Sequence, residues 1–371
     1  MPRELMKGNY AMAEAAVRAG LEGYFGYPIT PQTEILEYLS KRLPELGRVF
    51  IQAESEVAAI NMVYGAACTG ARIMTTSSGP GVSLMAEGMS YIAGSEIPMV
   101  LGNVMRGGPG LGNIAPSQSD YNQMVHGAGH GDYHQIVLAP AGVQETIDLT
   151  VEAFDLAEQY RSIVIVLIDG TIGQMMEPAE LPPMKETPKN RPDWAIGRFE
   201  MGEQRLINSF NLDPRGLELM NIKRMKTWLD IKERESRSYE YYLDDSEFIV
   251  VAFGTAGRVC LSSVQQARKK GIKVGLFRPI TLSPFPCEML REASKTVSGL
   301  LVVEMNAGQM LLDVRNSVGD EIPLNFYGRV GGLVPYPGEI LAQIEELAKK
   351  AVGGTGRDAW ERWMQNIQRV V

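Results

Sequence analysis

The sequence predicts an α/β protein built around a parallel sheet, followed by a second, smaller α/β domain. Between residues 8 and 170, short apolar segments typical of strands alternate with segments of helical periodicity. The same alternation returns at residue 247 and continues to about residue 349. Repeated strand–helix units of this kind imply parallel strands whose two faces are covered by helices.

The expected elements follow in order along the chain. In the first segment we expect helices at 8–19, 31–42, 55–69, 82–93 and 143–160, and strands at 24–27, 48–52, 72–76, 98–104, 136–139 and 162–169. In the second segment we expect strands at 248–253, 274–277 and 300–304, and helices at 257–270, 286–297 and 337–349. The first domain is therefore placed at 1–180 and the second at 245–350, with a tail at 351–371. Residues 181–244 are expected to be a linker and an irregular excursion or helical bridge, because residues 178–200 hold five prolines and no periodicity.

Composition excludes several classes of function. The net charge of −8 over 371 residues opposes binding to nucleic acid and to anionic membranes. No apolar run is long enough to span a bilayer, and the amino terminus shows no secretory signal, so we expect a cytoplasmic protein.

The metal-binding residue types are sparse. Cys68, Cys260 and Cys287 are scattered, whereas an iron–sulfur cluster needs about four closely spaced thiolates, so we expect buried structural thiols and no cluster on this chain. His126, His130 and His134 have a spacing that would align them on a helix. Interleaved glycines make a helix there improbable on propensity grounds, which leaves a loop at the entrance of a site as the alternative to metal binding.

Four loops that follow expected strands of the first domain carry unusual residues. They comprise residues 27–31, 54–56, 77–81 and 106–113. Because the carboxyl ends of parallel strands meet at one edge of a sheet, we expect a hydroxyl, a carboxylate, a glycine turn and a guanidinium to gather there.

Each of these residues also has a purely structural interpretation. Thr30 before Pro31 suits a helix cap with proline at the first helical position. Glu56 could favour the dipole of a helix, and Arg106 could pair with a surface carboxylate. The glycines at 79 and 81 do not extend to a dinucleotide fingerprint, because Leu84 occupies the position where that motif has glycine or alanine.

Five segments resemble the alpha subunit of the 2-oxoacid:ferredoxin oxidoreductases. They are Gly-Tyr-Pro-Ile-Thr-Pro (26–31), Glu-Ser-Glu-Val-Ala-Ala (54–59), Thr-Ser-Ser-Gly-Pro-Gly (76–81), Arg-Gly-Gly-Pro-Gly-Leu-Gly-Asn (106–113) and Val-Val-Glu-Met-Asn (302–306). The resemblance implies a pyrimidine-binding domain for thiamine diphosphate, followed by a domain similar to the transketolase C-terminal domain.

The resemblance also implies roles for particular residues. Glu56 matches the glutamate that shares a proton with N1′ of the aminopyrimidine, which favours the imino tautomer needed to activate the thiazolium. Pro28, Ser78 and Gly79 belong to the segments that bind the cofactor. Arg106 matches the arginine that binds the substrate carboxylate, and Thr30 matches a threonine that contacts the substrate.

The chain lacks parts that the complete reaction requires. It has no Gly-Asp-Gly motif followed by an Asn pair for the diphosphate and its Mg²⁺, and no cysteine set for [4Fe–4S] clusters. The resemblance implies that a beta subunit supplies these groups, with gamma and ferredoxin-like delta subunits in the complex, and that CoA and ferredoxin take part.

The expected reaction is oxidative decarboxylation of a 2-oxoacid to an acyl-CoA and CO2. A branched-chain substrate such as 2-oxoisovalerate is favoured, because the 108–119 run is most similar to those members and no Lys or Arg follows Arg106 before Arg161. The alternatives are 2-oxoglutarate or pyruvate as substrate, a subunit of a non-oxidative thiamine-dependent decarboxylase, and a silent scaffold. A decarboxylase subunit would leave the residues after 245 unexplained, and a scaffold would not need Thr30, Glu56 and Arg106.

Overall fold

The computed structural model describes residues 3–127, 129–187, 190–196, 205–319, 322–349 and 358–367. The chain forms two compact units. Unit 1 comprises residues 1–105 and 123–234, and unit 2 comprises residues 106–122 and 235–371. The predicted α/β class with parallel sheets is confirmed in both units.

The sheet of unit 1 is parallel, with strand order β6-β7-β5-β4-β2-β3. Its strands are β2 (Gly23–Gly26), β3 (Val49–Gln52), β4 (Ile73–Ser77), β5 (Met99–Met105), β6 (Ile136–Leu138) and β7 (Ile163–Asp169). The two longest strands, β5 and β7, are buried along their whole length, as the unbroken apolar run at 163–168 predicts for a strand covered on both faces.

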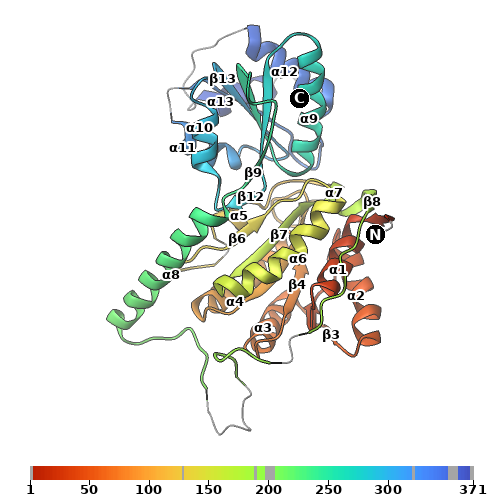
Figure 1. The fold of residues 1–371 in the computed structure, drawn as a ribbon, viewed down its shortest axis with the longest axis vertical. Coiled ribbons are helices and arrows are strands. Elements are labelled where there is room, and N and C mark those ends of the chain that lie inside the picture. Colours follow the sequence, from red (N-terminus) through yellow and green to blue (C-terminus); the bar gives the residue numbers. More distant parts are fainter. Residues whose placement is uncertain are drawn as a thin grey trace. The chain divides into compact units, whose positions relative to one another are not determined.

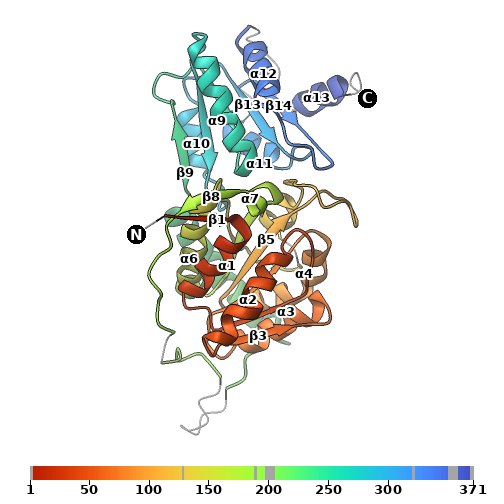
Figure 2. The ribbon, with the colours of Figure 1, turned by 90° about the vertical axis from the view of Figure 1, so that its right-hand side faces the viewer.

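Helices cover both faces of this sheet. Their bounds are α1 (Gly8–Arg18), α2 (Thr33–Glu45), α3 (Glu56–Ala67), α4 (Pro80–Gly94) and α6 (Val143–Tyr160). Helix α1 packs on α2 and α6, whereas α3 packs on α4. Right-handed crossovers between parallel strands place these two groups on opposite faces, an arrangement that Figure 1 and Figure 2 show from two sides.

Three short elements of unit 1 were not predicted. Strand β1 (Glu4–Lys7) pairs antiparallel with β8 (Met176–Ala179), and α7 (Gly170–Gln174) follows β7 directly. The side chain of Asp169 caps α7 by accepting hydrogen bonds from the backbone N–H groups of Thr171 and Ile172. Such short elements depend on pairing and capping with distant residues, which periodicity does not reveal.

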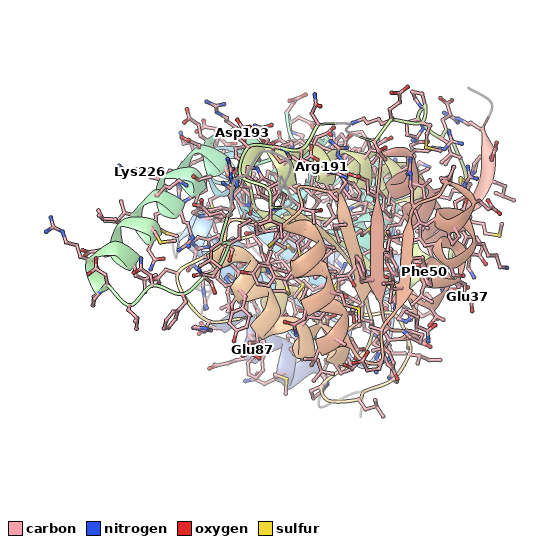
Figure 3. All side chains as sticks on the ribbon, turned by 90° about the horizontal axis from the view of Figure 1, so that it is seen from below. Glu37, Phe50, Glu87, Arg191, Asp193 and Lys226 are labelled. Carbon is pink, nitrogen blue, oxygen red and sulfur yellow. The ribbon has the colours of Figure 1, made fainter. Side chains whose placement is uncertain are left out.

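The charged stretch after residue 205 contains a long helix, α8 (Pro214–Glu235). The sequence left open whether this stretch is irregular or a helical bridge, and a helix is observed. Only Ile231 of this helix is buried. Its attachment to unit 1 includes Trp228, whose ring stacks on His134 with the centroids 4.5 Å apart. Figure 3 labels Lys226 on α8 and Phe50 on the edge strand β3, at opposite sides of unit 1.

Unit 2 contains a smaller sheet with strand order β14-β13-β10-β11-β9. Strands β10 (Phe248–Val251), β11 (Val274–Pro279), β13 (Gly299–Glu304) and β14 (Leu324–Gly328) are parallel, and β9 (Ser238–Tyr241) is an antiparallel edge strand. Helix α9 (Gly254–Lys269) packs on α12 (Pro337–Lys349), and α10 (Cys287–Ala293) packs on α11 (Met310–Val318). The short strand β12 (Thr281–Ser283) follows β11.

The expected C-terminal tail contains a helix, α13 (Ala359–Ile367), which packs on β14. Trp363 is buried there, and its indole N–H donates to the carbonyl oxygen of Gly328 at 3.0 Å. The domain limits at residues 180, 245 and 350 stay predictions. Among the residues that the structure describes, no helix combines the length and apolarity required to cross a bilayer.

Candidate active site

The turn that follows β2 is fixed by buried polar side chains. Gln32 donates from its amide nitrogen to the carbonyl oxygen of Tyr27 at 3.0 Å and accepts from the Thr76 hydroxyl at 2.6 Å. The Tyr24 hydroxyl lies 2.6 Å from the same Thr76 oxygen. Burial raises the pKa of Tyr24, so its hydroxyl keeps its proton for this chain of hydrogen bonds. The turn therefore has a defined shape at the carboxyl edge of the sheet.

Thr30 and Pro28 lie in this turn. Thr30 is exposed and Pro28 is half-buried. Helix α2 begins at Thr33 with Gln32 at the cap position, so the interpretation of Thr30 as a helix cap and Pro31 as the first helical residue is wrong. Thr30 and Pro31 both precede the helix, and the peptide bond between them is cis. Thr30 consequently remains at the edge where a ligand would approach.

Glu56 is the first residue of α3, and its exposed fraction is only 5%. The preceding residue, Ser55, caps the helix by accepting a hydrogen bond from the backbone N–H of Ala58 at 3.1 Å. The cap fixes the direction in which α3 leaves β3, so the Glu56 carboxylate is held inward rather than free in solvent.

The loop after β4 brings a glycine turn against Glu56. A Cβ atom at Gly81 would lie 2.5 Å from Oε1 of Glu56 and 2.3 Å from Oγ of Ser77, so only glycine leaves room for both groups. Gly79 has φ +41°, a conformation that L side chains rarely adopt, and it immediately precedes α4. Glu56, Ser77 and the glycine turn therefore meet at one place in unit 1, as expected from the strand ends.

Two buried hydroxyls beside this turn suggest a ligand. Ser77 and Ser78 are fully buried, and within the described part of the chain neither hydroxyl has a hydrogen-bond partner. A buried polar group without a partner is costly, which favours a ligand with polar ring atoms at this position. An aminopyrimidine offers ring nitrogens and an amino group, so the carboxylate, the hydroxyls and the glycine gap fit such a ring.

Arg106 does not belong to the same unit as these residues. The stretch after β5 was expected to be a loop of the first domain, whereas residues 106–122 cluster with unit 2. We call residues 106–122 the strap. Arg106 is 6% exposed, so it is not a surface arginine, and its Nη2 donates to the carbonyl oxygen of Leu111 at 2.9 Å.

The strap is held to unit 2 by the segment that follows β13. The backbone N–H of Gln118 donates to the Met305 carbonyl at 3.0 Å, and Oε1 of Gln118 accepts from the Met305 N–H at 2.9 Å. The Gln118 side chain also donates to the Phe253 carbonyl at 2.8 Å. Asn306 completes the attachment by donating to the Gln118 carbonyl at 2.8 Å. The Val-Val-Glu-Met-Asn segment thus fixes the strap that carries Arg106.

Glu304 of the same segment is fully buried. Its carboxylate accepts hydrogen bonds from the backbone N–H groups of Met310 and Leu311, at 2.8 and 2.9 Å, at the beginning of α11. Burial raises the pKa of Glu304 to about 7, and these donors oppose the rise. Glu304 therefore ties β13 to α11 and is structural within unit 2.

The three histidines do not lie on one helix. Residues 126–134 do not form a helix where the structure describes them, and no group of three metal-ligating side chains occurs among the described residues. His134 stacks on Trp228 of α8, and burial lowers its pKa. Two cysteines are buried as expected, Cys68 and Cys260, whereas Cys287 is only half-buried.

A cavity of unit 1 lies away from this edge. It has a volume of about 480 Å³ and lies at the amino ends of β4 and β5, under residues 190–194. Its arginines are paired: Arg72 with Asp155 and Glu158, and Arg191 with Glu22. Figure 3 labels Arg191 and Asp193 of this segment. Because ligands of open parallel sheets bind at the carboxyl ends of strands, the candidate active site is assigned to the carboxyl edge of the sheet and not to this cavity.

Family models match almost the whole chain. Residues 14–252 match the pyruvate flavodoxin/ferredoxin oxidoreductase, thiamine diphosphate-binding model, and residues 246–340 match core domain II of pyruvate:ferredoxin oxidoreductase. The chain belongs to this family. It is an alpha-type subunit of the 2-oxoacid:ferredoxin oxidoreductases, and its first domain is a thiamine diphosphate-binding domain. The predicted family is confirmed.

Two relatives of this oxidoreductase subunit are named after different 2-oxoacids. It is 48% identical to the ketoisovalerate oxidoreductase subunit VorB of Methanothermobacter thermautotrophicus, over 94% of this chain and 99% of that protein. It is 39% identical to the 2-oxoglutarate synthase subunit KorA of Archaeoglobus fulgidus, over 85% of this chain and 91% of that protein.

Two solved structures are similar to this subunit. The 2-oxoglutarate:ferredoxin oxidoreductase of Magnetococcus marinus, with 2-oxoglutarate, coenzyme A and succinyl-CoA bound, matches with TM-score 0.83 and 28% identity, over 93% of this chain and 65% of that chain. A split-gene transketolase in an inactive beta4 tetramer matches with TM-score 0.58 and 14% identity, over 92% of this chain and 97% of that chain. The second similarity is one of fold alone.

Several residues around this candidate site gave no individual signal in the sequence. Ser77 and Gly81 lie within the recognised 76–81 segment, but their contact with Glu56 depends on how α3 and α4 pack. Gln32 and Thr76 were missed because their side chains meet across 44 residues. Gln118 lies in an uncharged run without periodicity, so its role in anchoring the strap becomes visible only through its hydrogen bonds with Met305.

Proposed function

We propose that this subunit, joined to a beta subunit, oxidatively decarboxylates a branched-chain 2-oxoacid to an acyl-CoA and CO2 and reduces ferredoxin. The observation that carries the proposal is the buried Glu56 carboxylate, which faces the Gly81 gap beside two hydroxyls without partners in the described chain. This arrangement lies in a domain of the thiamine diphosphate-binding family.

Glu56 is proposed to act as the catalytic acid–base group of this chain. Its carboxylate would share a proton with N1′ of the aminopyrimidine, at the start of α3 where the Ser55 cap holds it inward. Ser78 and Gly79, with Pro28 from the neighbouring turn, would line the ring. When bound, thiamine diphosphate supplies the nucleophilic carbon and the electron sink for loss of CO2.

Thr30 and Arg106 are proposed to bind the substrate. Thr30 is exposed at the carboxyl edge of unit 1. The Arg106 guanidinium is planar and suited to bidentate contact with the 1-carboxylate of a 2-oxoacid. Its position at the base of the strap, anchored through Gln118, would hold the guanidinium in one place during turnover.

The remaining groups are proposed to come from partner subunits. The chain has no Gly-Asp-Gly motif with an Asn pair, and its three cysteines are free and separate. A beta subunit would bind the diphosphate, Mg²⁺ and [4Fe–4S] clusters, with gamma and ferredoxin-like delta subunits completing a complex that uses CoA and ferredoxin. In support, the relatives in Aeropyrum pernix and Saccharolobus solfataricus are named as subunit alpha, which implies further subunits in those enzymes.

The charge distribution favours an apolar substrate side chain. No Lys or Arg occurs between Arg106 and Arg161, so this stretch offers no cation to the distal carboxylate of 2-oxoglutarate. Burying such a carboxylate without a partner is costly. The 48% identity to a ketoisovalerate oxidoreductase subunit supports the same choice of 2-oxoisovalerate.

The test is a comparison of kcat/KM for 2-oxoisovalerate, pyruvate and 2-oxoglutarate on the native complex, with CoA and a viologen dye. We expect 2-oxoisovalerate to be preferred, with dye reduction that depends on CoA. A preference for 2-oxoglutarate of about tenfold or more, roughly 1.4 kcal/mol, would disprove the charge argument. Release of CO2 without CoA or an electron acceptor would instead identify a non-oxidative decarboxylase.

A further inference from the structure

Two loops of unit 2 expose large apolar side chains. Leu111 is 81% exposed and Ile114 is 66% exposed at the tip of the strap. Val330, Leu333 and Tyr336, in the loop between β14 and α12, are 44%, 56% and 69% exposed. We call these five residues the tip patch. Apolar side chains that gather from two loops, instead of occurring singly, are typical of an interaction site.

The two loops are joined to each other and internally braced. Asn113 donates from its side chain to the carbonyl oxygen of Gly331 at 2.9 Å and accepts from the backbone N–H of Ala115 at 2.9 Å. The backbone N–H of Asn113 donates to the Gly107 carbonyl, and that of Gly107 donates to the Ala115 carbonyl, each at 3.0 Å. The tip patch is therefore presented in a fixed shape, which lowers the entropy lost when a partner binds.

The stretches of these loops between the flanking charges, Arg106 and Asp120 in one and Arg329 and Glu339 in the other, contain no charged residue. Residues 107–119 and 330–338 include no Asp, Glu, Lys or Arg, although such residues make up 22% of the chain. Solvent-exposed loops are normally polar, whereas the centre of a protein interface is depleted of charge and rich in aromatic and aliphatic side chains. The composition thus favours burial of this surface by another protein.

A second exposed apolar surface lacks these features. On α8, Leu219 and Leu229 are 59% and 63% exposed. They alternate with charged residues such as Lys223, Lys226 and Asp230 along a helix with one buried residue. That pattern is typical of a solvated helix face, so α8 provides a matched control.

The tip patch is continuous with the candidate substrate-binding residue. The Arg106 guanidinium donates to the carbonyl of Leu111, so the residue at the tip and the buried guanidinium are directly connected. A protein that covers Leu111 would therefore lie next to the group proposed to bind the 2-oxoacid. In the proposed function, the beta subunit completes the active site, so it would have to lie close to Arg106.

We propose that the tip patch is the docking surface for the subunit that carries the diphosphate-binding residues missing from this chain. The inference rests on the proposed function, since it takes the active site to be shared with that subunit. A docking surface beside Arg106 would couple assembly to catalysis, because the guanidinium would be held and shielded from water when the partner is seated.

The experiment uses the full chain and its native partner subunit. Leu111→Asp and Tyr336→Asp are made separately, and the dissociation constant for the partner is measured by surface plasmon resonance. An interfacial carboxylate without a counterion should weaken binding by roughly 100-fold. Leu229→Asp on α8 introduces the same charge at a comparably exposed leucine and should leave the dissociation constant unchanged. Near-ultraviolet circular dichroism of each variant verifies the fold, and Leu111→Met should keep wild-type affinity.

Several outcomes would overturn the proposal. Wild-type affinity in both aspartate variants, or equal weakening by Leu229→Asp, would remove the tip patch from the interface. A change limited to self-association would assign it to a second copy of this chain, and a change limited to ferredoxin reduction would assign it to the electron acceptor. A complex that forms through the tip patch but oxidises no 2-oxoacid would disprove the proposed function and leave the docking surface intact.

Discussion

The carboxylate of Glu56 depends on its neighbours for its position. Ser55 caps α3, and Gly81 leaves space that any side chain would fill, so Oε1 of Glu56 can lie against the loop after β4. A glutamate at the beginning of a helix is common, because it favours the helix dipole. Helix stability does not, however, require that this glutamate be only 5% exposed, or that it lie beside buried hydroxyls for which the described chain offers no hydrogen-bond partner. The surroundings therefore support a chemical role.

We expect Glu56→Gln to reduce turnover of the assembled complex by roughly 10²–10⁴-fold, because an amide cannot share the proton at N1′. Dye-coupled oxidation of 2-oxoisovalerate measures the loss, and size-exclusion chromatography verifies assembly. Glu54→Gln is the matched control, since Glu54 is an exposed carboxylate two residues earlier. Wild-type turnover in a cofactor-loaded Glu56→Gln complex would remove this residue from the mechanism.

Glu304 shows how burial can make the stability of one unit depend on pH. Its pKa is raised by burial to about 7 from an ordinary value of 4.5. Between these values the folded chain holds a proton that the unfolded chain has released. Stability is therefore greatest below about pH 4.5 as far as this group is concerned, and falls as pH rises toward 7.

We expect Glu304→Gln to flatten this part of the stability profile. At about 1.4 kcal/mol per pKa unit, the contribution of Glu304 amounts to at most about 3 kcal/mol. Urea denaturation of the purified chain at about pH 5 and about pH 7.5 measures it. Glu288→Gln, which changes a carboxylate with 85% side-chain exposure, should keep the wild-type pH dependence. An unchanged slope in Glu304→Gln would mean that other groups cause it.

At the scale of elements, the strap is the segment whose placement matters most. It follows β5 directly, but its hydrogen bonds go to Met305, Phe253 and Asn306 of unit 2. The path of the strap after Arg106 therefore depends on β13 and the residues after it as well as on β5.

Gln118→Ala should loosen the strap and raise KM more than it lowers kcat. The change leaves the buried N–H of Met305 and carbonyl of Phe253 without their partner, at roughly 1–3 kcal/mol for each group. Hydrogen exchange of residues 106–122 measures the loosening independently of activity. Gln265→Ala, at an exposed glutamine of α9, should change neither quantity. Wild-type exchange rates in Gln118→Ala would refute the anchoring role.

At the scale of the whole molecule, the proposed function implies an active site divided between this chain and a partner subunit. Pyrimidine-binding features are present, whereas the diphosphate motif and the cysteines for clusters are missing from the sequence. A cofactor held at one end only would bind weakly, because the charged diphosphate contributes much of the affinity through its metal.

The isolated chain should therefore be colourless, bind thiamine diphosphate weakly and lack oxidoreductase activity. Visible absorbance detects iron–sulfur clusters, and calorimetric titration with Mg²⁺ present measures cofactor binding. Addition of the partner subunit should restore both colour and tight binding. Tight Mg²⁺-dependent binding by the chain alone would show that it has a diphosphate site of its own.

The sequence by itself determined the family, the α/β class and most long elements. Helix α6 was predicted with its observed limits, and β5 and β7 to within one residue at each end, because buried strands and amphipathic helices have periodicities that depend only on local residue order. Glu56, Ser78 and Gly79 were recognisable because they are contiguous with characteristic segments of the sequence.

Only the tertiary structure decided which of these residues meet. Glu56 and Ser77 both lie close to Gly81 because α3 packs on α4, and the anchoring of the strap joins Gln118 to residues 135 and 187 positions away. Short elements such as β1, β8 and β9 form by pairing with distant strands. Sequence patterns record local preferences, whereas these contacts are long-range and gain their free energy only when the chain is folded.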